Sequence, residues 1–309
     1  MIISKIKEKP VVKKIIVIVA IVLVVANIVS AIVVSESFLN RERFLKKEES
    51  NKIISVELSS QEHINWLKVK AEEIALKDGD EVALYLKNKS TSHSYMIILH
   101  SLTTNAYDMA SYAYHFYDLG FTVYVPEYMG ETVSMGIKEQ DVVLKWAEHI
   151  AEADNKANIF VFGLGTGATT ALLCADNLKH DNVKGVISDS GYSDVKELFE
   201  ISINDIYGVP SFPTVALSSL YVKITRELNF KEENVLNAVR EAEVPILYIH
   251  GTEDSIVPIQ QSNRLYEVTR AKGSDHITVY GAEHGQTMTE DVEKYWREVD
   301  AFIRNSMDY

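Results

Sequence analysis

The sequence predicts an α/β fold: a mostly parallel, twisted sheet with helices on both faces and a helical cap, preceded by one N-terminal transmembrane helix. Two observations carry this prediction. The uncharged run 15–34 is long enough to span a bilayer, and from about Val69 onward short β-branched runs alternate with helical patterns. The 309 residues are 47% hydrophobic and 24% charged, which excludes a disordered or collagen-like chain. A single cysteine, Cys174, excludes an intrachain disulfide and a cysteine-rich zinc site.

The chain divides by composition into a basic tail (1–14), a transmembrane helix (15–34), a stalk or linker (35–65) and the α/β domain (66–309), whose cap insertion covers about 192–243. At about 1.5 Å per residue, the apolar run crosses the ~30 Å hydrocarbon layer. The alternative is a cleaved signal peptide, but the apolar cores of signal peptides run to only ~7–15 residues. The mixed-charge stretch 36–51 predicts a solvated helical stalk.

The distribution of charge bears on orientation and on partners. Basic residues flank both ends of the span, five lysines before it and Arg41, Arg43, Lys46 and Lys47 after it. The positive-inside rule favours, by a narrow margin, a single-pass protein of the cell membrane with its C-terminal domain outside the cytoplasm. The net charge is −13, and because residues 1–14 contribute +4, the rest of the chain carries −17. This charge argues against a nucleic-acid partner, whose phosphates it repels.

Strands and helices follow one another in regular succession after the span. An opening hairpin is expected from 73–77 and 81–87, around the turn Asp78-Gly79. Further strands are expected at 95–99, 121–125 (ended by Pro126), 158–162, 183–188, 245–250 and 276–280. Helices are expected at 107–119, 140–153, 168–178, 259–271 and 290–305, with a mainly helical region at 192–243.

The hexapeptide GLGTGA at 163–168 lies between a predicted strand and a predicted helix, and it fits two kinds of site. As a dinucleotide site it matches G-x-G-x-x-A, with Asp189 at the end of the next strand as the ribose-binding acid. As a nucleophile elbow, G-x-S-x-G, it turns sharply and lifts its central residue above the sheet. Here the central residue is Gly165. The hexapeptide alone does not decide between the two.

Two later loops favour the elbow, because an elbow needs an acid and then a histidine further along the chain. The segment YIHGTEDSIVP at 248–258 places Asp254 after the penultimate strand. The segment YGAEHG at 280–285 places His284 after the last strand. Both loops lie at the C-terminal ends of strands, where ligands bind in such sheets.

On these motifs the sequence resembles the alpha/beta-hydrolase superfamily, in particular membrane-anchored bacterial members related to serine aminopeptidases, esterases and lysophospholipases. The resemblance covers roughly 66–302: HSL at 100–102 matches the H-G oxyanion segment, PEYMGETVSMG at 126–136 matches P-D-x-R-G-H-G-x-S-x-G, and 163–167 matches the elbow. DSGY at 189–192 resembles the segment after the sixth strand. The resemblance implies hydrolysis of a carboxylic ester or amide. It implies Asp254 and His284 as acid and base, with Leu102 and Thr166 supplying the oxyanion hole.

The departures from the family pattern fall on the chemistry. Gly165 stands where the family has the nucleophilic serine, and Ser101 stands where it has glycine. Without an Oγ at position 165, His284 has no hydroxyl to deprotonate there, so the ordinary covalent route is closed. Glycine is tolerated because an elbow residue has a positive φ, which costs a residue with a Cβ about 1–3 kcal/mol. Thr166 is not expected to replace the serine, because its side chain should point away from the pocket.

The leading hypothesis is a membrane-anchored protein of this fold that is impaired or non-catalytic and binds an acyl-ester or peptide-like small ligand. Its pocket is expected beneath the cap, bounded by Leu102, Gly165, Thr166, Asp254 and His284.

Two alternatives stay open: a residual hydrolase in which His284, oriented by Asp254, activates a water, and a dinucleotide-binding protein using the turn at 163–168. A serine removed by engineering would give the same sequence. No cofactor is expected, and no metal, since the histidines lack paired metal-ligand spacing. The sequence specifies neither the substrate nor the oligomeric state.

Overall fold

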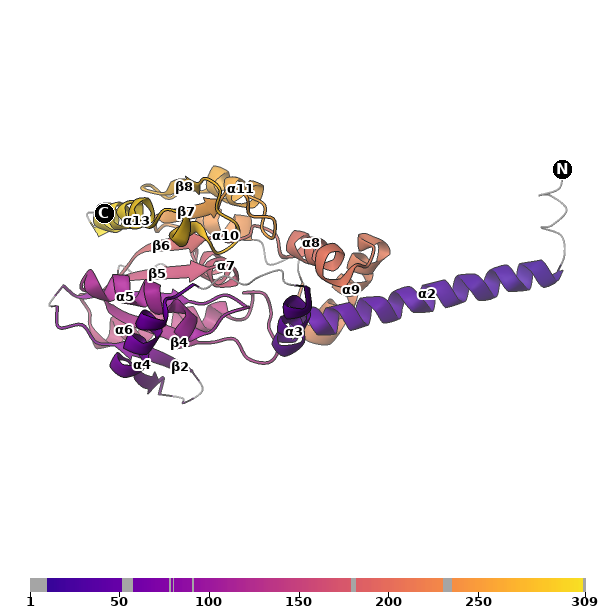
Figure 1. Ribbon diagram of the computed structural model, residues 1–309, viewed down its shortest axis with the longest axis horizontal. Coiled ribbons are helices and arrows are strands. Elements are labelled where there is room, and N and C mark those ends of the chain that lie inside the picture. Colours follow the sequence, from indigo (N-terminus) through magenta and orange to yellow (C-terminus); the bar gives the residue numbers. More distant parts are fainter. Residues whose placement is uncertain are drawn as a thin grey trace.

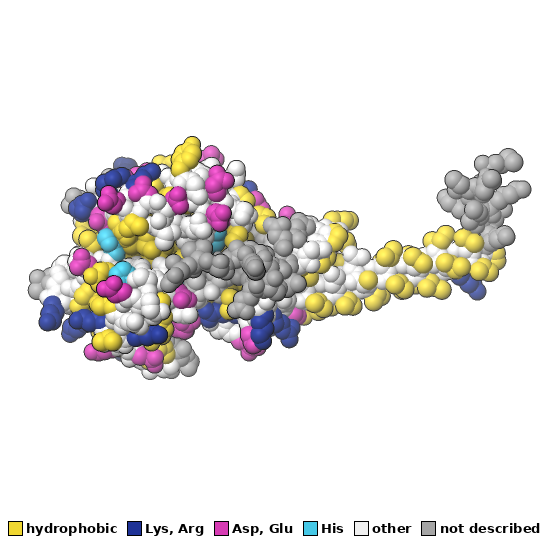
Figure 2. Space-filling model, in the orientation of Figure 1, with side chains coloured by type: hydrophobic (Ala, Val, Ile, Leu, Met, Phe, Trp, Pro, Cys, Tyr) yellow, Lys and Arg dark blue, Asp and Glu magenta, His cyan; other side chains and the backbone are white. Residues whose placement is uncertain are grey.

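A long helix projects from a globular part in the structure, a computed structural model that describes residues 10–51, 58–77, 79, 81–90, 92–178, 182–229 and 235–307 (Figure 1). This helix, α2 (Pro10–Leu39), contains the predicted span, and apolar side chains cover its projecting part (Figure 2). Over the described residues, α2 alone is long and apolar enough to cross a membrane, with a mean hydropathy of 3.2. A signal sequence near an N-terminus would meet the same criterion.

The globular part is built on one sheet with the strand order β1-β2-β4-β3-β5-β6-β7-β8. The strands are β1 (Glu72–Ala75), β2 (Val82–Leu86), β3 (Ser94–Leu99), β4 (Thr122–Glu127), β5 (Asn158–Leu164), β6 (Val183–Asp189), β7 (Ile246–Gly251) and β8 (Asp275–Val279). Strand β2 pairs antiparallel with β1 and β4, and the remaining pairs are parallel. This arrangement confirms the predicted hairpin and the predicted parallel sheet.

Helices cover both faces of the sheet because successive residues of a strand point to opposite sides. In β3, Met96 and Ile98 join one apolar cluster, while Ile97 and Leu99 join the other. The first cluster includes residues of α4 (Gln61–Lys70), η1 (Ala106–Met109), α5 (Ala110–Asp118), α12 (Thr287–Glu290) and α13 (Val292–Met307). The second includes residues of α6 (Gln140–Ala153), α7 (Thr166–Leu173), α10 (Val235–Glu241) and α11 (Gln260–Val268).

One predicted boundary is wrong: Pro126 does not end its strand, since β4 continues to Glu127. The reason lies in the pairing, because β3 pairs with β4 only as far as Tyr124. Beyond that point Pro126 faces a partner strand only on the β2 side, opposite Ala83. The missing N–H of proline therefore removes no bond to β3.

The region at 192–243 is helical, as predicted, but its three helices lie in two places. Helices α8 (Val195–Tyr207) and α9 (Ser211–Arg226), together called the cap below, lie beside the end of α2 (Figure 1). Helix α10 packs instead against α7 and α11 on the sheet. The cap therefore packs against α2, the helix that contains the predicted span.

The stretch 36–51, expected to be a solvated stalk, is packed over its first half. Helix α2 runs on to Leu39, and α3 (Arg41–Asn51) follows it. Phe38, Leu39 and Phe44 are buried. Phe38 lies one turn after Val34 on the face that meets the cap, and its ring centroid is 4.7 Å from that of Phe199 in α8. The expectation is wrong because a few apolar residues at helical spacing outweigh the surrounding charges.

This packing predicts a large loss of stability for Phe38→Ala. A Phe→Ala change at a fully buried position costs about 3–5 kcal/mol, whereas Val33→Ala changes an exposed side chain one turn earlier on α2. Thermal unfolding of the full chain in detergent should show a marked fall in midpoint for Phe38→Ala and almost none for Val33→Ala. Equal midpoints for the two variants would mean that the segment is a stalk after all.

Candidate active site

The glycine turn after β5 has the shape of an elbow. Gly165 has φ 55° and ψ −114°, a conformation that glycine adopts freely and other residues adopt only with strain. Its N–H donates to the Asp189 carbonyl at 2.8 Å. On either side the backbones approach so closely that a Cβ at Gly163 would lie 2.3 Å from the Gly167 carbonyl oxygen. The glycines at 163 and 167 therefore allow the sharp turn, and Gly165 occupies its apex.

The two predicted loops bring Asp254 and His284 together. Asp254 Oδ2 lies 2.8 Å from His284 Nδ1 and 3.3 Å from His250 Nε2. Asp254 Oδ1 accepts the backbone N–H groups of Ile256 and Val257, at 3.0 and 2.7 Å. Because an ionised carboxylate only accepts hydrogen bonds, His284 carries its proton on Nδ1 and presents Nε2 as the basic nitrogen.

The environment of Asp254 keeps it ionised. Burial by itself raises the pKa of this carboxyl group, but the charges and hydrogen bonds of His284 and His250 outweigh burial and hold the pKa well below its usual range. An ionised Asp254 orients the imidazole of His284 and stabilises the imidazolium that forms when Nε2 takes a proton. Asp254 and His284 therefore have the ionisation state and the contact that an acid–base pair needs.

The nucleophile position lies directly against this base. A Cβ built on Gly165 would be 3.3 Å from His284 Nε2. It would also be 2.7 Å from Ser101 Oγ, which is closer than real Cβ contacts come. The Ser101 side chain therefore extends into the space that a side chain at position 165 would need.

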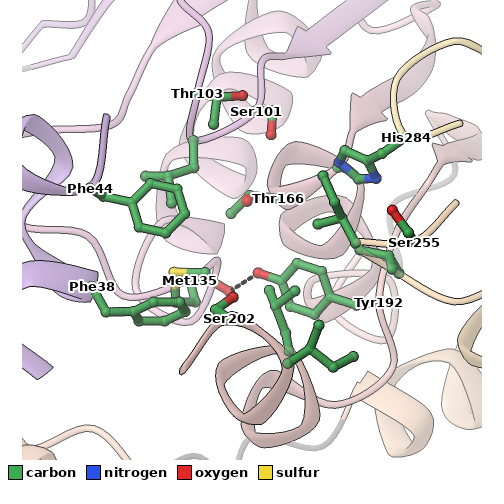
Figure 3. A pocket seen from close by; sticks show the side chains of 16 residues that line it. Phe38, Phe44, Ser101, Thr103, Met135, Thr166, Tyr192, Ser202, Ser255 and His284 are labelled. Carbon is green, nitrogen blue, oxygen red and sulfur yellow. Dashed lines mark hydrogen bonds between the residues drawn. The ribbon is translucent and has the colours of Figure 1, made fainter. Parts of the chain in front are cut away.

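A cavity of about 340 Å³ opens at this point (Figure 3). Of the residues expected to bound the pocket, Leu102, Gly165, Thr166 and His284 line it. Asp254 does not, because it lies behind His284 and is 5% exposed. The expectation that the Thr166 side chain points away is also wrong, since Figure 3 shows it inside the cavity. The remaining lining residues are Phe38, Phe44, Ser101, Thr103, Met135, Tyr192, Leu198, Ile201, Ser202, Ser255, Ile256 and Val257.

The two residues predicted to form the oxyanion hole lie on different elements. Thr166 is the first residue of α7, where backbone N–H groups have no partner within the helix. Leu102 lies in the loop after β3, and its carbonyl accepts a hydrogen bond from Arg41 Nε at 3.2 Å. Arg41 also donates to the carbonyls of Met129, at 3.1 Å, and Thr104. One guanidinium at the start of α3 thus holds the loop that carries Leu102 against the loop after β4.

Sequence reasoning missed Phe38, Arg41 and Phe44. All three lie in the predicted stalk, yet two line the cavity and the third fixes the loop that carries Leu102. The sequence signal was present, because Phe38 continues the apolar spacing of the span and Phe44 interrupts a run of charged residues. The loop after β4 lacks the family's aspartate, arginine and histidine, and Arg41 donates to a carbonyl of this loop.

Asp189 and Ser190 are buried and form hydrogen bonds inside the protein. Asp189 is fully buried, and its carboxylate accepts hydroxyl hydrogen bonds from Ser190, Thr287 and Tyr295 at 3.0, 2.6 and 2.9 Å. Burial raises the pKa of Asp189, and the three hydroxyl groups oppose this rise. The acid that a ribose would need is thus engaged with the C-terminal helices, which weakens the dinucleotide alternative. No group of three potential metal ligands occurs within the described residues.

A sheet of this strand order, with an elbow after β5, an acid after β7 and a histidine after β8, defines an alpha/beta-hydrolase-fold protein. The chain belongs to the prolyl oligopeptidase family, whose sequence model matches residues 107–308. A relative, the uncharacterized protein YqkD of Bacillus subtilis (strain 168), is 27% identical over 220 residues, which are 69% of this chain and 72% of the relative.

Two solved structures share the fold at low sequence identity. The Pyrococcus furiosus esterase Pf2001 superposes with a TM-score of 0.61 at 19% identity, covering 76% of this chain and 90% of the esterase. A membrane phospholipase A, described as a bacterial virulence factor, has a TM-score of 0.55 at 12% identity and covers 96% of this chain and 99% of its own.

The Arg41 contacts predict that Arg41→Ala loosens the loop that carries Leu102. Losing charge-assisted hydrogen bonds to three carbonyls should cost roughly 1.5–3 kcal/mol. Arg43→Ala is the matched control, because Arg43 is exposed two residues further along α3. Urea unfolding of the full chain in detergent should show a lower midpoint for Arg41→Ala only. Identical midpoints for both variants would contradict the bracing role.

Proposed function

We propose that this chain is a membrane-anchored protein of the hydrolase fold whose cavity binds an acyl-ester or peptide-like small ligand and whose covalent turnover is impaired. One observation carries the proposal: His284 Nε2 lies 3.3 Å from the position of a Cβ at residue 165, while Asp254 holds Nδ1 at 2.8 Å. Acid, base and elbow are arranged around a nucleophile that Gly165 does not provide.

The walls of the cavity suit a ligand with an apolar part and a polar end. Phe38, Phe44 and Met135 lie on one side of the cavity, and His284 lies opposite them (Figure 3). Ser101 also lines the cavity. An acyl chain would contact the apolar wall while its ester or amide group reached His284. The similar structures named as an esterase and a phospholipase A favour an ester. The family name favours a peptide-like amide.

The proposed anchor is the span 15–34 within α2, with residues 35–65 joining it to the hydrolase domain from residue 66 onward. Phe38 lies four residues, or about 6 Å of helix, beyond the end of this span. The ligand cavity therefore begins within one helical turn of the proposed membrane boundary. Such closeness supports an anchor that is retained in the mature protein. The charge asymmetry around the span supports placing the C-terminal domain outside the cytoplasm.

Residual hydrolysis through an activated water is the second candidate. The space above Gly165 is bordered by Ser101 Oγ and His284 Nε2, two polar groups that a water can bridge. His284 would take a proton from this water as the oxygen attacked the ligand carbonyl. Hydrolysis that His284→Ala abolishes, without any covalent labelling of the enzyme, would identify this route.

The missing nucleophile predicts no labelling of the unmodified protein by a fluorophosphonate, because this probe needs an activated serine. Gly165→Ser should restore labelling, and Gly165→Ser combined with Ser101→Gly should label faster, since the pair removes the 2.7 Å contact. The strained backbone should lower stability by roughly 1–3 kcal/mol in both variants. Gel fluorescence after probe treatment measures the labelling, and His284→Ala in the double variant is the control that should abolish it.

Labelling of the unmodified protein would refute the proposal and direct attention to Ser101, since the Ser190 hydroxyl donates to buried Asp189. A folded double variant that fails to label would show that the site has lost more than its nucleophile. The binding role alone would then remain.

The anchor predicts that the mature protein stays in the membrane fraction after washing with high salt. Protease added to intact cells should remove the C-terminal domain, because this domain is proposed to lie outside. A cytoplasmic protein marker that survives the same treatment is the control. A soluble protein whose N-terminus begins near Ile32 would show signal-peptide cleavage instead.

A further inference from the structure

Helix α9 of the cap is apolar on both of its faces. Its inner face, with Val215 and Val222, is buried. Its outer face carries Ala216, Leu220 and Ile224 at four-residue spacing, and Leu220 and Ile224 are 56 and 71% exposed. Phe212 lies at a kink near the start of the helix, where its backbone is not helical, and it is 86% exposed. A surface helix ordinarily presents polar residues to water, and a group of exposed large apolar side chains marks a surface that contacts a partner or a membrane. The outer face of α9 is therefore a candidate contact surface.

The position of α9 beside α2 indicates what covers it. Ser218 donates a hydrogen bond to the Ala31 carbonyl at 3.1 Å, while Tyr221 and Arg226 bond to Glu36 at 2.7 and 2.8 Å. The two helices therefore advance in the same direction. Ala31 lies inside the proposed span, which ends at Val34, so the level of Ser218 lies inside the bilayer boundary. Residues before Ser218, including Ala216, lie deeper still.

The polarity of α9 changes along its length in step with this geometry. The first part carries no charge, and its charged residues, Lys223 and Arg226, come in the last turn beside Glu36. Glu36 is two residues beyond the proposed end of the span. The uncharged part of α9 thus adjoins the apolar part of α2, and the charged part adjoins the polar segment.

We infer that the outer face of α9, formed by Ala216, Leu220 and Ile224, is embedded in the interfacial layer of the lipid bilayer together with exposed Phe212 at the kink. This inference rests on the proposed anchor, because the bilayer level is set by the span in α2. Helix α9 packs beside α2 (Figure 1), so one bilayer would cover the apolar side chains of both helices. The cap would then contact the membrane along α9, in addition to being tethered by α2.

The test measures lipid contact at single cysteines in the full chain reconstituted in liposomes. Ala216→Cys and Leu220→Cys carry an environment-sensitive fluorophore on the outer face of α9. Val22→Cys reports on the span, and Val69→Cys, at an 88% exposed residue of α4, is the water-exposed control. Cys174 is fully buried and burial raises the pKa of its thiol, so the unmodified protein should take up no label.

Lipids that carry a quencher in their acyl chains should reduce the fluorescence at Ala216 and Leu220, more strongly at Ala216, and leave Val69 unchanged. The emission of both α9 labels should be shifted to shorter wavelength than that of Val69. If Val22 is quenched while both α9 labels behave like Val69, the anchor stands and the inference about α9 is overturned. If α9 labels are shifted but not quenched, protein covers the face, as in a second copy of this chain, and the inference is also overturned. Absence of quenching at Val22 would overturn the anchor and the inference together.

Discussion

The sharp turn at residue 165 is the constraint on which the rest of the site depends. Only glycine fits at 163 and 167, where the backbones nearly touch, and these two positions fix the direction in which β5 enters α7. That direction brings position 165 beneath the imidazole of His284 and leaves the first N–H of α7 at the cavity. A serine at the apex would have to bear the positive φ, while Gly165 adopts it without strain. The backbone of an elbow is therefore present with less strain than a serine would bear, but position 165 has no hydroxyl group.

Helix α2, the proposed anchor, is a structural part of the site. Phe38 at its C-terminal end is a wall of the cavity, and Arg41, two residues beyond the helix, bonds to the loop that carries Leu102. Asn40 bridges to Thr132, which attaches the same segment to the loop after β4. Motion of the helix in a bilayer would reach the cavity through these contacts. A domain cut free at residue 36 would keep Phe38 and Arg41 but lose the helix that positions them, so studies of the site require the full chain.

Most of the fold followed from the sequence because its signals are local. Parallel strands buried on both faces read as apolar runs, and α6 at Gln140–Ala153 has the bounds that its helical period predicts. The order of the motifs was sufficient to bring Asp254 and His284 to one edge of the sheet. The packing of 36–44 was not predictable in this way, because the burial of Phe38 depends on α8, more than 150 residues later. Likewise, the Thr166 side chain was expected to point away from the pocket because Thr166 is one residue past the apex of the elbow. It lines the cavity because the cavity extends past the elbow to Tyr192 and the cap.

Ser101 and Gly165 are adjacent at the cavity, and the side chain of one occupies space next to the other. A family glycine at position 101 leaves room for the nucleophile, whereas Ser101 places its Oγ 2.7 Å from where that side chain would begin. In its present rotamer the Ser101 side chain therefore occupies space that a side chain at position 165 would enter, and Gly165 leaves that space open. Asp254 also has a structural role that does not depend on catalysis, because its Oδ1 accepts hydrogen bonds from two backbone N–H groups of its own loop. Retention of the acid is therefore weak support for turnover. The contact between positions 101 and 165 bears more directly on the proposed binding role, because glycine at position 165 leaves the Ser101 hydroxyl undisturbed at the cavity.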